Sequence, residues 1–179
     1  HKNNLINLVT VSRLDENKRI DILIKAVSKL IKDGFRVNLK IGGNGPSLDG
    51  LKTLVSDDGI TDSVDFLGFV PEADIPLLYE GMDLFVTIDW ADYRITTYEV
   101  LSKNRQVIVS NDTDVDPKLI ESGYLFTSAP RAEALADIIL AALKTKVTWS
   151  KNELSEYLLA YSWPVYFENI TKSIEARDA

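Results

Sequence analysis

The chain has 179 residues, of which 45% are hydrophobic and 26% charged, as in an ordinary globular domain with a sizeable core. It has no cysteine, and its one histidine is His1, so disulfides, thiolate catalysis and cysteine- or histidine-rich metal sites are excluded. A mechanism that needs a histidine base would have to take it from a region outside this sequence or from another chain. The net charge of −7 leaves no obvious basic face for nucleic acid and argues against strong attraction to anionic membranes. No long uncharged apolar run occurs, so no transmembrane segment is expected, and the lack of cysteine fits a cytoplasmic protein.

Short apolar runs alternate with helical patterns along the chain. Strands are expected at residues 8–11, 37–41, 64–67, 84–88, 107–109 and 124–126. Helices are expected at residues 20–31, 48–55, 73–80, 96–102, 117–122 and 135–143. Residues 144–150 are expected to connect this region to a C-terminal helical segment at about residues 150–176, where Ser162 could cap a helix that Trp163 anchors.

This alternation predicts the fold class α/β, with a doubly wound, Rossmann-like parallel sheet. Most of the strands are continuous apolar runs, which suit strands covered on both faces. We expect residues 1–179 to form a single domain. Ligands of such sheets bind beyond the carboxyl ends of the strands, so the loops of interest follow Val11, Ile41, Leu67, Ile88 and Val109.

Two cations follow the first strand. Arg13 and Lys18 could point into the crevice at its carboxyl end and hold a diphosphate, the arginine as a planar fork and the lysine as a point charge. Spacing alone favours the alternative, two solvated surface charges.

A glycine-rich loop, residues 42–46, separates the second strand from the second helix. Gly43 and Gly45 fit part of the G-x-G-x-x-G pattern, but Leu48 stands in place of the third glycine. The backbone amides of such a loop can approach a phosphate. A purely structural turn is the favoured interpretation.

Acidic residues surround the junction after the fourth strand. A carboxylate of Asp89, Asp92 or Glu99 could accept hydrogen bonds from ribose or sugar hydroxyls. Thr96 and Thr97 could cap the next helix, whose amides could bind phosphate. Capping plus exposed acids explains the same residues equally well.

Aromatic and acidic residues elsewhere favour structural roles. Phe66, Phe69 and Tyr79 are expected in the core. Asp57 and Asp58 are expected in a solvated loop, and no metal site is predicted there.

The segments in order resemble the C-terminal, donor-binding domain of retaining GT-B glycosyltransferases of group 1, a family-four-like class. The resemblance runs over roughly residues 7–176. Its pieces are Val11-Ser12-Arg13-Leu14 with Lys18, Leu39 to Pro46, Val64 to Val70, Ile75 to Tyr79, Asp83 to Val86, Thr96 to Leu101, Val107 to Ser110, Ser122 to Phe126 and Tyr161-Ser162-Trp163.

The resemblance implies a role for the positions that match. Arg13 and Lys18 match the basic pair that binds the donor diphosphate, and Ile95 and Thr96 fall where helix-start amides meet phosphate. Glu99 matches the second glutamate of the family's E-x7-E motif, which binds the donor ribose.

The remaining implied contacts concern the base and the partner domain. Phe69 and Val70 fall where the backbone frames the nucleotide base. The donor would be a UDP- or GDP-sugar, activated without an obligatory metal or other cofactor. An N-terminal acceptor-binding domain of the same protein would complete the enzyme, and that domain could make a peripheral membrane contact.

One loop departs from the family pattern. Ala91 stands where the first glutamate belongs, and Arg94 replaces a glycine. Asp89 or Asp92 could substitute for the lost carboxylate, and Arg94 could add a phosphate contact, so these three are candidate sugar-binding residues. Asn104 and Gln106 also replace a glycine and a proline of the family.

Two function hypotheses follow. The first is a retaining, hexosyl-type glycosyltransferase whose acceptor site lies outside this chain, so that the chain alone would not turn over. The second is a degenerate, non-catalytic subunit that binds an active transferase. Loss of nucleotide binding would favour the second. An unrelated doubly wound regulator is a third, weaker hypothesis.

Overall fold

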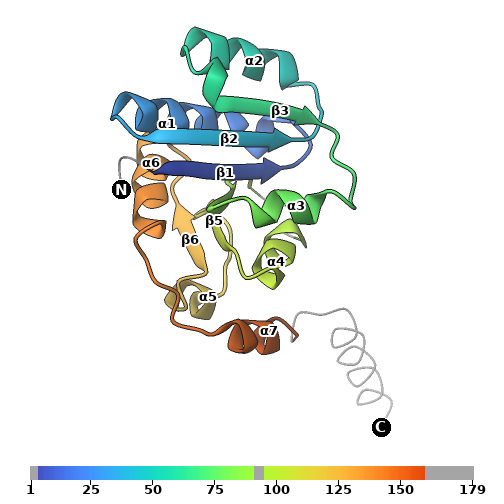
Figure 1. Ribbon diagram of the computed structural model, residues 1–179, viewed down its shortest axis with the longest axis vertical. Coiled ribbons are helices and arrows are strands. Elements are labelled where there is room, and N and C mark those ends of the chain that lie inside the picture. Colours follow the sequence, from blue (N-terminus) through green and yellow to red (C-terminus); the bar gives the residue numbers. More distant parts are fainter. Residues whose placement is uncertain (1–3, 91–94, 160–179) are drawn as a thin grey trace.

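A computed structural model describes residues 4–90 and 95–159 and shows one six-stranded parallel sheet (Figure 1). The strands are β1 (Leu5–Val11), β2 (Arg36–Gly42), β3 (Val64–Gly68), β4 (Leu84–Thr87), β5 (Gln106–Ser110) and β6 (Leu125–Ser128). The helices are α1 (Ile20–Lys32), α2 (Leu48–Asp57), α3 (Ile75–Glu80), α4 (Ile95–Ser102), α5 (Pro117–Glu121), α6 (Ala132–Ala142) and α7 (Lys151–Leu159). The predicted α/β class and doubly wound sheet are confirmed.

Alternating strand side chains divide the interior into two hydrophobic clusters, one on each face of the sheet. On one face, Leu8 and Val86 pack with buried residues of α1, α2 and α6. On the other face, Val9 and Phe85 pack with buried residues of α3, α4, α5 and α7. Successive residues of a strand point to opposite faces, so continuous apolar runs supply both clusters.

Helix α1 forms because its apolar residues fall on one stripe, with Leu23, Ile24 and Val27 all buried. It ends where the sequence predicts, at Asp33 before Gly34, whose φ of +88° is easy only for glycine. Its start is unusual, because Arg19 occupies the N-cap position in the left-handed conformation, with φ 52° and ψ 35°.

The strand order is β3-β2-β1-β4-β5-β6, so the order reverses between β1 and β4. The connections from β1 run outward to β2 and β3, and those from β4 run the other way to β5 and β6. The carboxyl ends of β1 and β4 are therefore the switch point of the sheet, where doubly wound sheets form the crevice that binds their ligands, and we call this place the crevice. In Figure 1 the arrowheads of β1, β2 and β3 mark the carboxyl ends of these strands.

Helix α7 begins with a capping box that the sequence analysis did not single out. The Ser150 amide donates to the Glu153 carboxylate at 2.7 Å, and the Glu153 amide donates to the Ser150 hydroxyl at 3.2 Å. The Tyr157 hydroxyl donates to Asp116, the N-cap of α5, and so ties α7 to α5. The predicted cap at Ser162 and anchor at Trp163 lie outside the described residues.

Two local expectations are wrong. Phe69 is not a core residue, because it lies on the loop after β3 with 77% of its surface exposed; Tyr79 is buried and Phe66 half-buried, as expected. Thr96 and Thr97 do not cap α4, because the helix already begins at Ile95 and includes both. Within the described ranges, no helix has the length and apolar character needed to cross a membrane.

Candidate functional site

Lys18 and Asp89 lie on the two sides of the crevice. Lys18 ends the 3-10 turn Glu16–Lys18 after β1, and Asp89 follows β4. The lysine Nζ lies 3.1 Å from Asp89 Oδ2, with only 15% and 8% of the two side chains exposed. Thr87 also donates its hydroxyl to Asp89 at 2.9 Å. The structure thus joins two predicted site residues that are 71 positions apart.

Arg19 bridges the same crevice further along the sheet. Its Nη1 donates to the carbonyl oxygen of Ile88 at 3.2 Å and to Asp112 Oδ2 at 2.7 Å, and Ser110 Oγ lies 3.4 Å away. These partners stand at or just beyond the carboxyl ends of β4 and β5. The guanidinium therefore ties the start of α1 to the carboxyl ends of β4 and β5.

Asp112 is held as a carboxylate by this arrangement. A hydrogen bond with the Ser110 side chain, followed by the bond and charge of Arg19, lowers the pKa of Asp112, although partial burial acts in the opposite direction. The Asp112 side chain is partly exposed, so water screens its interaction with Arg19.

The glycine loop packs directly against the loop that follows β1. Ser12 and Leu14 donate backbone bonds of 3.0 Å to Gly42 and Asn44. A Cβ at Gly43 would lie 1.8 Å from the Ser12 carbonyl oxygen, and Gly43 has a φ of +123°. This close approach supports the structural interpretation of the loop.

The loop after β3 is attached to the glycine loop by a side chain. With its amide oriented to satisfy both groups, Asn44 accepts from the Phe69 amide and donates to the Gly43 carbonyl oxygen, each at 3.2 Å. The Phe69 backbone is therefore held at the crevice while its ring faces solvent. Val70 lies beside it and would meet a Cβ at Gly42.

Helix α4 supplies the opposite wall. Ile95 is exposed and Thr96 half-buried in its first turn, and Glu99 is exposed one turn further along. Thr97 is buried, and its hydroxyl has no hydrogen-bond partner among the described residues. The start of this helix thus combines backbone amides with unused hydrogen-bonding capacity.

Other predicted residues are not assembled here. Arg13 pairs with Asp15 of its own loop at 3.2 Å, and 73% of its side chain is exposed, as the solvated alternative predicts. Ala91, Asp92 and Arg94 lie outside the described residues. In the described ranges, no three His, Cys, Asp or Glu side chains gather as a metal ion would require.

Arg19, Ser110 and Asp112 were missed by the sequence analysis. A signal was available, because a cation directly before a helix opposes the positive end of the helix dipole and is a poor N-cap. An arginine at that position therefore indicates a tertiary partner, although the identity of that partner is not a local property.

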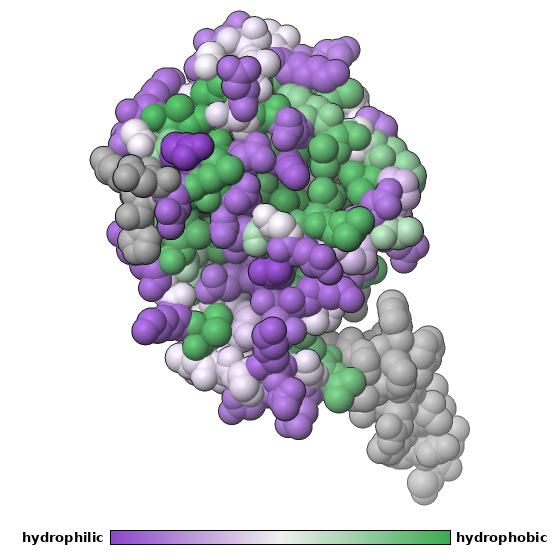
Figure 2. Space-filling model, viewed as in Figure 1, coloured by the Kyte–Doolittle hydropathy of each residue, from purple (hydrophilic) through white to green (hydrophobic). Residues whose placement is uncertain are grey.

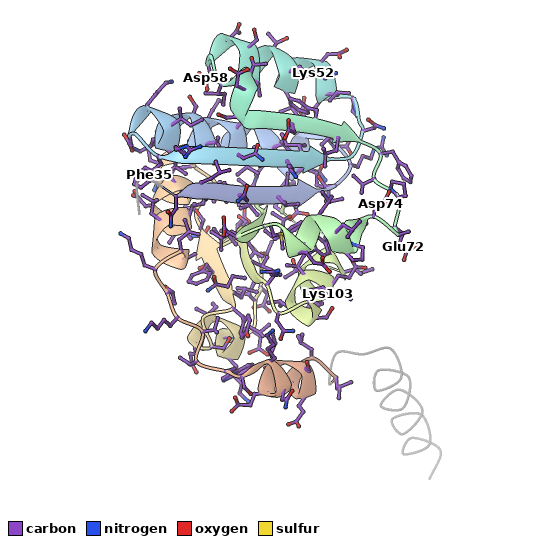
Figure 3. All side chains as sticks on the ribbon, in the orientation of Figure 1. Phe35, Lys52, Asp58, Glu72, Asp74 and Lys103 are labelled. Carbon is purple, nitrogen blue, oxygen red and sulfur yellow. The ribbon has the colours of Figure 1, made fainter. Side chains whose placement is uncertain are left out.

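A cavity lies at the other end of the sheet. It has a volume of about 500 Å³ and is lined by Asn4, Leu5, Ile6, Phe35, Asp83, Leu140, Leu143 and Lys144. These residues precede or begin the strands, or end α6. Figure 3 shows Phe35 at this end, whereas Glu72 and Asp74 lie at the end where β3 finishes. The cavity is therefore separate from the crevice.

Exposed hydrophobic side chains surround the crevice side. Phe69, Leu77, Trp90 and Ile95 are exposed on the loops and helices that follow β3 and β4, whereas Leu159, also exposed, ends α7. Figure 2 shows hydrophobic surface at this end of the molecule, interrupted by hydrophilic groups. The exposed hydrophobic side chains after β3 and β4 indicate a surface that another part of a protein can cover.

The fold and the crevice together define a doubly wound domain of the kind that binds its ligand at the switch point of the sheet. Residues 1–158 match the family described as glycosyl transferases group 1, and the chain therefore belongs to this family. It is 29% identical to alpha-monoglucosyldiacylglycerol synthase of Streptococcus pneumoniae over 157 residues. The aligned region covers 87% of this chain and 35% of that protein. The chain thus spans about a third of that relative's length.

Solved structures show the same fold. The chain resembles the lipopolysaccharide outer core galactosyltransferase WaaB with a TM-score of 0.80 and 15% identity, over 98% of this chain and 50% of that one. It resembles the pneumococcal O-GlcNAc transferase GtfA, solved with UDP and GlcNAc, with a TM-score of 0.73 and 19% identity, over 96% of this chain and 35% of that one.

Proposed function

We propose that this chain is the donor-binding domain of a glycosyltransferase that transfers a hexosyl group from a UDP- or GDP-sugar with retention of configuration. The observation that carries the proposal is Lys18, whose largely buried side chain lies 3.1 Å from Asp89, beyond the carboxyl end of β4 and next to β1 in the sheet order. A cation at this point suits a diphosphate, whose charge grows as the glycosidic bond to the sugar breaks. Family membership and the UDP-bound structure of GtfA support it.

Each part of the donor has a candidate contact. Lys18 would bind the diphosphate together with the first amides of α4, at Ile95 and Thr96, and Arg13 could join them by rotating from Asp15. Glu99, which is exposed on α4, would accept hydrogen bonds from the ribose hydroxyls.

The base and the sugar would lie on either side of the diphosphate. The backbone at Phe69 and Val70 would frame the base, since Asn44 holds this loop at the crevice. Asp89, Asp92 and Arg94 remain candidates for the sugar, although Asp89 is already bound to Lys18. No metal ion or other cofactor is assigned a role.

We infer that the acceptor binds a further domain of a longer protein. The exposed hydrophobic side chains at the crevice, with Phe69, Trp90 and Ile95 among them, are suited to face such a domain. The proposal includes a cytoplasmic location, with any peripheral membrane contact made by the other domain.

Calorimetric titration of the chain with UDP and GDP tests the proposal. One nucleotide should bind, and both Lys18→Ala and Glu99→Ala should weaken it about tenfold or more, because each removes a charged contact. Lys25→Ala is the matched control, because Lys25 is exposed on α1 and pairs with Asp21. Folded protein that binds neither nucleotide would contradict the proposal and favour a non-catalytic subunit.

A further inference from the structure

Each cation between β1 and α1 is paired with an aspartate. Arg13 lies 3.2 Å from Asp15, Lys18 lies 3.1 Å from Asp89, and Arg19 lies 2.7 Å from Asp112. A bare cluster of cations would give the crevice a strongly positive potential. These pairs cancel much of it, so the structure offers a weaker attraction to polyphosphate than the basic residues alone suggest.

The central pair differs from the other two in its burial. The Arg13 side chain is largely exposed, and Asp112 is partly exposed, so water and salt screen those pairs. Lys18 and Asp89 are both shielded, and charges in such a place interact over several ångströms with little screening. The Asp89 carboxylate therefore acts on any anion that reaches Lys18.

Asp89 is held in its position by more than the lysine. Thr87, the last residue of β4, donates its hydroxyl to Asp89 Oδ1, while Lys18 is bound at Oδ2. The two carboxylate oxygens are thus fixed in separate bonds. An incoming diphosphate has to share the lysine with this carboxylate or displace it.

We propose that Asp89 opposes the donor diphosphate and sets its affinity at a reduced level, in place of a contact with the sugar. This inference rests on the proposed function of the crevice. A diphosphate placed at Lys18 brings like charges close to Asp89, and the repulsion cancels part of the attraction by the lysine. Release of the nucleoside diphosphate after transfer is favoured by the same repulsion.

Asp89→Asn tests the inference, because it removes the charge and keeps a side chain of the same shape. Calorimetric titration with UDP, GDP and inorganic pyrophosphate should show binding about tenfold tighter than in the unsubstituted chain. In a Lys18→Met background the anion is no longer held beside Asp89 and the lysine cannot be released from it, so the same substitution should give a smaller gain. Circular dichroism and thermal unfolding check the fold, and Asp89→Ala serves as a second variant.

Asp83→Asn is the matched control. Asp83 lies at the opposite end of β4, where it accepts from the Asn7 amide at 2.7 Å, so the variant makes the same change in net charge away from the crevice. Unchanged binding in this variant is expected. An equal gain would mean that only net charge matters and would overturn the inference.

The outcomes separate the inference from the proposed function. If the unsubstituted chain binds UDP or GDP and folded Asp89→Asn binds it equally or more weakly, Asp89 is not an opposing residue and the inference is wrong. If pyrophosphate binding tightens in Asp89→Asn while no nucleotide binds either protein, the inference holds and the nucleotide assignment fails. If no anion binds either protein, both fail.

Discussion

At the scale of single residues, Tyr79 illustrates how burial changes a side chain that has no functional assignment. Its hydroxyl is buried without a hydrogen-bond partner among the described residues. Burial, and to a lesser extent the charge of Glu99, raises its pKa from 10 to about 12. Its ring packs edge-on against Phe85, with 5.8 Å between centroids and 88° between planes.

We expect Tyr79→Phe to keep the ring contact and remove the unpaired hydroxyl. The free energy of unfolding at pH 7 should stay the same or rise by about 1 kcal/mol. Because the pKa of Tyr79 is higher in the folded than in the unfolded chain, its protonated hydroxyl contributes stability that is fully present below pH 10. This contribution is lost as the pH rises from 10 towards 12. The variant should therefore lose less stability than the unsubstituted chain over this range, as measured by urea unfolding. A loss above 1 kcal/mol at pH 7 would show that the hydroxyl has a partner.

At the scale of elements, the crevice is shaped by two loops in close contact. The glycine loop after β2 approaches the loop after β1 so closely that Gly43 and Gly45 have backbone atoms where a side chain would stand. The distances from their Cβ positions to the Ser12 and Leu14 carbonyl oxygens would be 1.8 Å and 2.4 Å. The loops therefore position Lys18 and Arg19 only if these glycines are kept.

Gly43→Ala should lower the free energy of unfolding by about 2 kcal/mol or more, because it adds both a positive-φ strain and a clash with backbone. Two glycines provide matched controls in chemical denaturation. Gly59 has a φ of +68° with open space, so Gly59→Ala reports the strain alone, whereas Gly50→Ala in α2 should stabilise by about 0.5–1 kcal/mol. Equal effects at Gly43 and Gly59 would refute the close-contact argument.

Arg19 holds strand ends through its partners, and its link to Asp112 can be measured by a double-mutant cycle. Arg19→Met should destabilise by about 1–3 kcal/mol, because it removes charged hydrogen bonds to Asp112 and to the Ile88 carbonyl oxygen. The double variant Arg19→Met/Asp112→Asn should lose less free energy of unfolding than the two single variants lose together. The difference, which measures the ion pair, should be about 1 kcal/mol or less. Additive effects in thermal unfolding would mean that the ion pair contributes nothing.

At the scale of the whole molecule, one sheet separates two hydrophobic clusters and belongs to both. Leu39 of β2 lies in the cluster under α1, α2 and α6, and Phe85 of β4 lies in the cluster under α3, α4, α5 and α7. Because β1, β4, β5 and β6 contribute to both clusters, neither cluster can form without the sheet. We expect the described region to unfold as one cooperative unit.

Leu39→Ala and Phe85→Ala test this cooperativity. Both side chains are fully buried, so each variant should lose about 2–5 kcal/mol. Near-ultraviolet and far-ultraviolet circular dichroism should follow the same single transition in both. Two separated transitions in either variant would show that the faces unfold independently.

The sequence predicted strands better than positions within loops. Apolar runs such as those of β4 and β5 identify strands because parallel strands are covered on both faces. Phe69 was placed wrongly in the core because hydrophobicity cannot distinguish a buried aromatic from one on a loop at the sheet edge. The capping box at Ser150 and Glu153 carries a local signature and was readable; the partners of Arg19 carry none.

The sequence by itself determined the order and type of the elements, the α/β class, the family resemblance and Lys18 as a candidate, because periodicity and motifs are local properties. Only the tertiary structure decided the strand order β3-β2-β1-β4-β5-β6 and the crevice between β1 and β4. It also decided that Lys18 meets Asp89 and Arg19 meets Asp112. These pairs depend on which strand ends become neighbours when the sheet assembles, and segments some 70 to 90 residues apart carry no record of that choice in their own spacing.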